Sequence, residues 1–142
     1  MRPMQPRIAE TDAEIEACFP VMQELRPHLR KEEFLPRVRA QAASGYRLAY
    51  LEVDGRPVAV AGFRFGENLA WGKFLYIDDL VTASAFRSKG YGATLLRWLH
   101  DLARANGCRE LHLDSGVQRT DAHRFYTREG MQISSYHFKT IL

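Results

Sequence analysis

The segment from Lys73 to Ala105 constrains the fold of this chain most, because a buried strand, a glycine loop and an amphipathic helix follow one another there. The run KFLYIDDLVT (73–82) is nearly continuous in apolar character apart from its acidic pair, which is typical of a strand covered on both faces. FRSKGYG (86–92) places two glycines behind an Arg and a Lys. In the following stretch 92–105, leucines recur along one helical stripe. This succession predicts an α/β fold in which helices pack on a sheet.

The rest of the chain supplies the other elements of such a fold. Asp54-Gly55 separates two β-rich runs and indicates a hairpin, because both residues tolerate a positive φ. Thr11 or Asp12 can cap a helix that reaches about Leu25. We further expect helices at Lys31–Ala43 and Asp121–Glu129, the latter capped by Thr120 or Asp121, and strands at Arg7–Glu10, Arg109–Val117 and Met131–Thr140. The predicted order is β-α-α-β-β-β-α-β-α-β, a mixed sheet with helices on its faces.

Length and composition bound the function. The 142 residues fit one domain spanning 1–142, and the balance of 46% hydrophobic and 26% charged residues is that of a soluble globular protein. No apolar run approaches the roughly 20 residues of a membrane span, and no secretory signal is recognisable, so we expect no membrane association and a cytoplasmic location. Two cysteines, Cys18 and Cys108, predict neither a disulfide framework nor a metal site. The formal charge of +3, carried by scattered basic residues, favours a small anionic ligand over nucleic acid.

The glycine loop has two interpretations. Gly90 and Gly92 let the backbone approach a ligand, and the free amides at the start of the next helix attract an anion. Arg87 and Lys89 add positive charge, so the loop can hold a pyrophosphate. Alternatively, it is a tight turn whose charged residues face water. It is neither a Walker A loop nor a Rossmann fingerprint, because the residues that define those motifs do not follow.

Two spaced motifs carry a resemblance to a known family. RSKGYG (87–92) matches the [R/Q]-x-x-G-x-[G/A] loop of the GNAT superfamily of acetyl-CoA-dependent N-acetyltransferases, with a strand before it and a helix after it. Downstream, Ala122, Phe125, Tyr126, Arg128, Gly130 and Met131 match the segment A-x-x-[FLY]-Y-x-[RK]-x-G-[FM]. The chain departs from the family at Arg119, where an Asn is frequent.

The resemblance implies a GNAT-like domain: a central, mostly antiparallel sheet with a splayed strand pair and helices on both faces. It implies acetyl-CoA as cosubstrate and no metal. Leu80, Val81 and Thr82 match the strand end that pairs with the pantetheine arm. The implied pyrophosphate site comprises Arg87, Ser88, Lys89, Gly90, Tyr91, Gly92 and Ala93.

The resemblance also names catalytic candidates. Tyr126 matches the tyrosine that protonates the departing thiolate; its alternative is a packing role beside Phe125. Asp79, with Asp78 as the fallback, is the candidate base, because two carboxylates that interrupt an apolar strand require a partner or a function. Strand neighbours face opposite sides, so at most one of the pair is expected to point into the acceptor site. The alternative for both is a salt bridge or a helix-end contact.

These observations predict an N-acetyltransferase that moves an acetyl group from acetyl-CoA to a primary amine by direct attack in a ternary complex. The alternative function is an acyl-CoA-binding regulatory or sensor module without turnover. The acceptor is a small-molecule or peptide amine, and the acidic pair favours a cationic one. The resemblance leaves open a monomer and a homodimer that pairs through the apolar end SSYHFKTIL (134–142).

Overall fold

The computed structural model describes residues 5–142, which form two compact units. The first unit ends at His112 and the second runs from Leu113 to Leu142. Five strands form a sheet in the order β1-β2-β3-β4-β5, and each pairing from β1 to β4 is antiparallel. The strands are β1 (Arg7–Ile8), β2 (Arg47–Val53), β3 (Arg56–Asn68), β4 (Gly72–Thr82) and β5 (Glu110–Leu113). The α/β fold class with a mixed sheet is confirmed.

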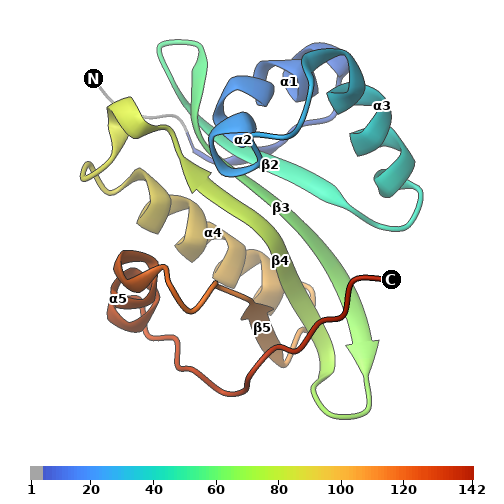
Figure 1. Cartoon of the computed structure of the whole chain (residues 1–142), viewed down its shortest axis with the longest axis vertical. Helices are drawn as coiled ribbons and strands as arrows, with labels where there is room; N and C mark the ends of the chain where they lie inside the picture. Colours follow the sequence, from blue (N-terminus) through green and yellow to red (C-terminus); the bar gives the residue numbers. More distant parts are fainter. Residues whose placement is uncertain (1–4) are drawn as a thin grey trace. The chain divides into compact units, whose positions relative to one another are not determined.

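Four helices belong to the first unit. Helices α1 (Asp12–Ala17), α2 (Phe19–Leu25) and α3 (Lys31–Ala42) cover one face of the sheet, and α4 (Tyr91–Ala105) covers the other (Figure 1). The single helix predicted to reach Leu25 is wrong in one respect, since it divides at Cys18. Pro20 lies in the first turn of α2, where its missing N–H costs no hydrogen bond and favours a new helix start. Each helix in residues 5–142 is too short or too polar to cross a membrane.

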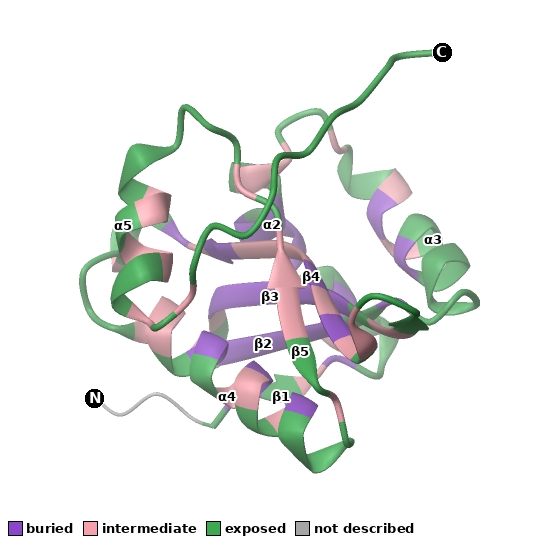
Figure 2. Ribbon diagram, turned by 90° about the horizontal axis from the view of Figure 1, so that it is seen from below, coloured by how far each residue is buried: buried purple, intermediate pink, exposed green. Residues whose placement is uncertain are grey.

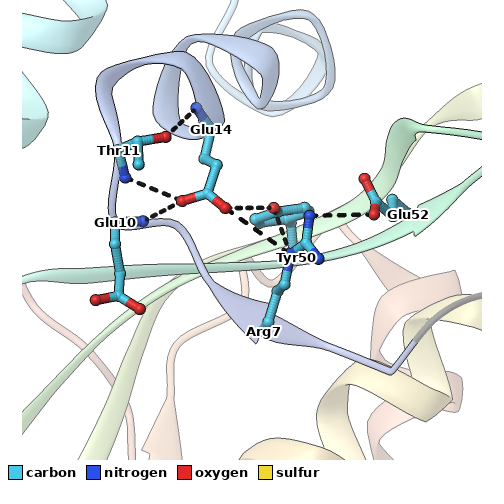
Figure 3. Close-up of polar contacts among 6 residues, drawn as sticks. All are labelled: Arg7, Glu10, Thr11, Glu14, Tyr50 and Glu52. Carbon is cyan, nitrogen blue, oxygen red and sulfur yellow. Dashed lines mark hydrogen bonds and ion pairs between the residues drawn. The ribbon is translucent and has the colours of Figure 1, made fainter.

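The start of α1 is fixed to the sheet by a polar network (Figure 3). Thr11 is the N-cap and forms a capping box with Glu14: its hydroxyl accepts from the Glu14 amide, and the Glu14 carboxylate accepts from the Thr11 amide. The same carboxylate accepts from the Tyr50 hydroxyl of β2 at 3.4 Å. Arg7 of β1 donates to the Tyr50 oxygen at 2.6 Å and pairs with Glu52. The first helix is therefore tied to β1 and β2.

Alternation along the strands separates two apolar layers, and most of β2 and β3 is buried (Figure 2). Leu48, Tyr50 and Val60 join the cluster beneath α1–α3, which includes Phe19, Phe34 and Val38. The side chains between them in the strands face the other way and are buried as well, as are four residues of α4: Leu95, Leu96, Leu99 and Ala103. Both faces of the sheet are thus covered, as the sequence of 73–82 predicts.

Two connections form as predicted. Asp54 and Gly55 adopt φ values of 54° and 77°, which make the tight β2–β3 hairpin. Gly107, with φ of 75°, ends α4, and the Arg109 amide then donates to the Lys73 carbonyl where β5 begins beside β4. β5 is shorter than predicted, since it ends at Leu113 rather than Val117.

The second unit contains α5 (Thr120–Arg128) and the C-terminal segment 131–142. The predicted side-chain cap of α5 is wrong: Arg119 occupies the N-cap position, and no side chain caps the helix. The predicted strand Met131–Thr140 is also wrong. The backbone of 132–142 makes no backbone hydrogen bond within the described chain, and a strand needs a neighbour to pair with.

Candidate active site

The glycine loop presents a row of free backbone amides. Gly90 precedes α4 in the left-handed region with φ of 83°, and Ser88 also has a positive φ of 66°. The first amide of the helix with a backbone acceptor is that of Thr94, which donates to Gly90 O. Within residues 5–142, none of the six amides from Ser88 to Ala93 has a hydrogen-bond acceptor. Such consecutive donors at a helix N-terminus bind an anion.

Contacts with α2 hold the start of this loop. The Ser84 amide donates to the Glu24 carboxylate at 2.9 Å, and the Arg87 guanidinium lies 3.9 Å from the same group. The segment Leu80–Thr82 at the end of β4 pairs with Ala59–Ala61 of β3. The loop therefore follows a strand end that is paired with β3 and a 3-10 turn (Ser84–Phe86) that is bonded to α2.

A β-bulge in β4 positions the acidic pair. Gly62 of β3 pairs with Asp79, whereas the next residue, Phe63, pairs with Ile77, so Asp78 is the extra residue. The Asp78 carboxylate binds Arg64, which faces the same side of β3 as Gly62. Both aspartates therefore line one cavity. The two aspartates do not face opposite sides, as strand alternation predicts, because the bulge interrupts that alternation.

Asp79 is held by two partners. Arg26, the C-cap residue of α2, donates from Nε to Oδ1 at 2.9 Å, and the Tyr46 hydroxyl donates to Oδ2 at 2.8 Å. Tyr46 is only 7% exposed, and burial, followed by the Asp79 charge, raises the pKa of its hydroxyl well above the ordinary value. Gly62 makes room for this contact, since a Cβ there would lie 1.8 Å from the Tyr46 hydroxyl oxygen.

Asp78 is bound differently. Arg64 Nε and Nη2 each donate to one of its carboxylate oxygens at 2.8 Å, a bidentate pairing. Its backbone carbonyl accepts from Arg26 Nη2 at 3.0 Å. Each aspartate is thus paired with its own arginine, as the salt-bridge alternative anticipates, and the Asp79 carboxylate is the one that meets Tyr46.

The cavity beside the acidic pair has a volume of about 350 Å³. Its wall on the α3 side comes from one stripe of that helix, at positions 34, 37, 38 and 41, whose spacing places them on one face. α2 contributes Met22, and the chain after it contributes Arg26, His28 and Leu29. A second cavity of about 360 Å³ adjoins Arg64 and Asp78 and is lined by aromatic rings, including Trp71.

Tyr126 lies in the second unit, on α5. It is half-buried, and its ring packs 5.3 Å from that of Phe125. Burial raises the pKa of its hydroxyl, an effect that Arg119 partly offsets. The hydroxyl therefore keeps its proton at neutral pH and can act as an acid. Nearby, His123 Nε2 contacts the Gly116 carbonyl at 2.8 Å, a structural contact.

Sequence reasoning missed the arginines and the tyrosine that surround the acidic pair. Arg26 follows α2, Tyr46 precedes β2 and Arg64 lies in β3, and no local motif connects them with Asp78 and Asp79. Only Gly62, inside an otherwise apolar strand, signals a close approach of another group. In the described part of the chain, no three His, Cys, Asp or Glu side chains gather as metal ligands would.

The profile of the acetyltransferase (GNAT) family matches residues 9–131. The chain belongs to this family. The matched region includes the glycine loop, both aspartates and Tyr126. This GNAT chain is accordingly an acyltransferase.

Similar proteins agree with this assignment. The GNAT chain is 42% identical over 123 residues to an uncharacterized N-acetyltransferase, YhdJ, of Bacillus subtilis (strain 168), covering 85% of this chain and 87% of that protein. It is 38% identical over 66 residues to the aminoalkylphosphonate N-acetyltransferase of Salmonella typhimurium, covering 46% of this chain and 43% of that one. The structure of aminoglycoside N-acetyltransferase AAC(6')-Iy in complex with CoA has the same fold, with a TM-score of 0.85, 14% identity and coverage of 100% and 97%.

Proposed function

We propose that the protein transfers an acetyl group from acetyl-CoA to a primary amine by direct attack in a ternary complex. The observation that carries this proposal is the row of six unpaired amides from Ser88 to Ala93 at the start of α4. The diphosphate of coenzyme A suits such a row, with Arg87 and Lys89 adding charge. Leu80, Val81 and Thr82 lie just upstream to pair with the pantetheine arm.

The reaction needs a nucleophile, an acid and a base. The amine nitrogen attacks the thioester carbon, forming a C–N bond as the C–S bond breaks. Tyr126 gives its proton to the departing thiolate; a tyrosine hydroxyl carries its proton at neutral pH, and burial, which raises the pKa of this one, keeps it protonated. Asp79 accepts the proton that the amine loses, directly or through water. We prefer it to Asp78, whose two carboxylate oxygens are both bound by Arg64.

The cysteines favour direct attack over an acyl-enzyme. Cys18 is fully buried, and burial raises the pKa of its thiol to about 12. Burial also raises the pKa of Cys108. A nucleophilic thiol needs the opposite shift, because only the thiolate attacks.

We also propose that two copies associate through the segment 131–142. Its large apolar side chains at positions 133, 136, 138, 141 and 142 are exposed, and its backbone groups from 132 onward lack backbone partners within the described chain. β5 is an edge strand of the sheet, so a second copy can supply the missing neighbour.

The test of the function is thiol release from acetyl-CoA in the presence of a panel of amines. We expect release that depends on both acetyl-CoA and an amine, with stoichiometric N-acetylated product detected by mass spectrometry. Tight binding of coenzyme A without release with any amine would instead support the sensor module. ATP that competes with acetyl-CoA at comparable affinity would contradict a site built for coenzyme A.

A further inference from the structure

The two carboxylates that line the cavity, those of Asp78 and Asp79, are already neutralised by arginines. Arg26 is engaged by Asp79, and Arg64 by Asp78, so each carboxylate already has a guanidinium. Arg37 also lines the cavity but makes no hydrogen bond or ion pair within residues 5–142. The acidic pair alone suggests a cationic acceptor. Arg26 and Arg64, the latter from the adjoining cavity, offset its two charges, and Arg37 then adds a positive charge that no carboxylate of the cavity offsets.

Arg37 is placed to meet a ligand. It projects from the same stripe of α3 as Phe34 and Val38, which are buried in the core and fix the orientation of that face. Its electrostatic neighbour is Glu33, whose carboxylate is bonded to Arg30. The Arg37 guanidinium is therefore free to bind an anion in fork geometry, and His28 lines the same cavity.

The geometry points to an acceptor amine that carries an anionic group, a carboxylate, phosphonate or phosphate, bound by Arg37. This inference rests on the proposed function, because it names the acceptor of that reaction. The amine of such a molecule meets the Asp79 carboxylate, which retains a lone pair on each oxygen. A polyamine or an aminoglycoside would bring several further positive charges to a cavity where both carboxylates are already paired with arginines and Arg37 is not paired.

Matched amines test this inference. Thiol release is measured with aminoethylphosphonate and β-alanine, which carry an anion, and with ethanolamine, n-propylamine and spermidine, which do not. We expect kcat/KM to be highest for the anionic pair. In Arg37→Gln, KM for aminoethylphosphonate should rise about 10- to 100-fold while kcat/KM for ethanolamine is unchanged, since only the anion loses a charged hydrogen bond. Lys31→Gln removes a positive charge from the same helix outside the cavity and should change neither value.

Two outcomes overturn the inference: preference for n-propylamine or spermidine, or an Arg37→Gln variant that loses activity equally with every amine. Calorimetric titration of aminoethylphosphonate into the protein without acetyl-CoA measures anion binding alone. It therefore tests the anion site independently of the proposed acetyl transfer. Binding that Arg37→Gln weakens, without thiol release from acetyl-CoA, supports the anion site and contradicts the transferase reaction. Turnover confined to amines that carry no anionic group supports the reaction and contradicts the anion site.

Discussion

Gly90 and Gly107 lie at the two ends of α4 and share a backbone conformation that side chains disfavour. Their φ values are 83° and 75°, and nothing lies within 4 Å of the position that a Cβ would occupy at either. A residue with a Cβ costs about 1–2 kcal/mol in this region. Their surroundings differ, because only Gly90 adjoins the unpaired amides.

This pair gives a matched test of the glycine loop. Gly90→Val and Gly107→Val should lower the free energy of unfolding by similar amounts, measured by urea denaturation. Only Gly90→Val should weaken coenzyme A binding, by about tenfold or more, because its loop must reshape around the diphosphate. Equal affinities in the two variants would mean that the loop is a plain turn.

Tyr126 gives a second prediction at this scale. Tyr126→Phe should lower the rate of thiol release about 10²- to 10⁴-fold by removing the acid, with coenzyme A affinity unchanged. Tyr50→Phe is the control: it removes a hydroxyl bound to Arg7, which should affect stability rather than turnover. An unaltered rate in Tyr126→Phe would leave the residue only its packing role beside Phe125.

At the scale of elements, the predictable parts of the structure were those with a local cause. The hairpin at Asp54-Gly55, the Thr11 cap and the α4 stripe each depend on residues close in sequence, and each forms as predicted. The bulge at Asp78 depends instead on how β3 and β4 pair, which local patterns do not encode. The acidic pair was therefore identified from sequence, but its orientation and its arginine partners were not.

Gly62 tests the packing at this bulge. In Gly62→Ala the new Cβ would overlap the Tyr46 hydroxyl, so the Tyr46–Asp79 contact should be displaced, with a loss of about 1–3 kcal/mol in the free energy of unfolding. In a Tyr46→Ala background the same change should cost less, because the ring is gone. Equal losses in both backgrounds, measured by urea denaturation, would show that Tyr46 is not the obstacle.

At the scale of the whole molecule, the second unit is where sequence patterns are least informative. The pattern of 131–140 predicts a strand, but a strand also requires a neighbour, and none pairs with it in the described chain. Phe138 is 91% exposed and Leu142 is fully exposed, an arrangement that favours association of two copies.

If two copies associate through this segment, a charge placed among its apolar side chains should abolish the dimer. Phe138→Glu should convert a dimer to a monomer in size-exclusion chromatography with light scattering, because a charge would be buried against the second copy. Lys139→Glu introduces a carboxylate on the opposite side of the extended segment and should leave the dimer intact. A wild-type protein that is monomeric at high concentration would contradict the proposal.

The central claim is that the amides from Ser88 to Ala93 bind the diphosphate of coenzyme A. Titration of isotope-labelled protein with coenzyme A, followed by NMR of the backbone amides, tests it most directly. We predict that the largest chemical shift changes at saturation fall on the amides of Ser88 to Ala93. These changes should be smaller when pantetheine, which lacks the diphosphate, replaces coenzyme A. Saturable binding that leaves these six amides unshifted would contradict the account.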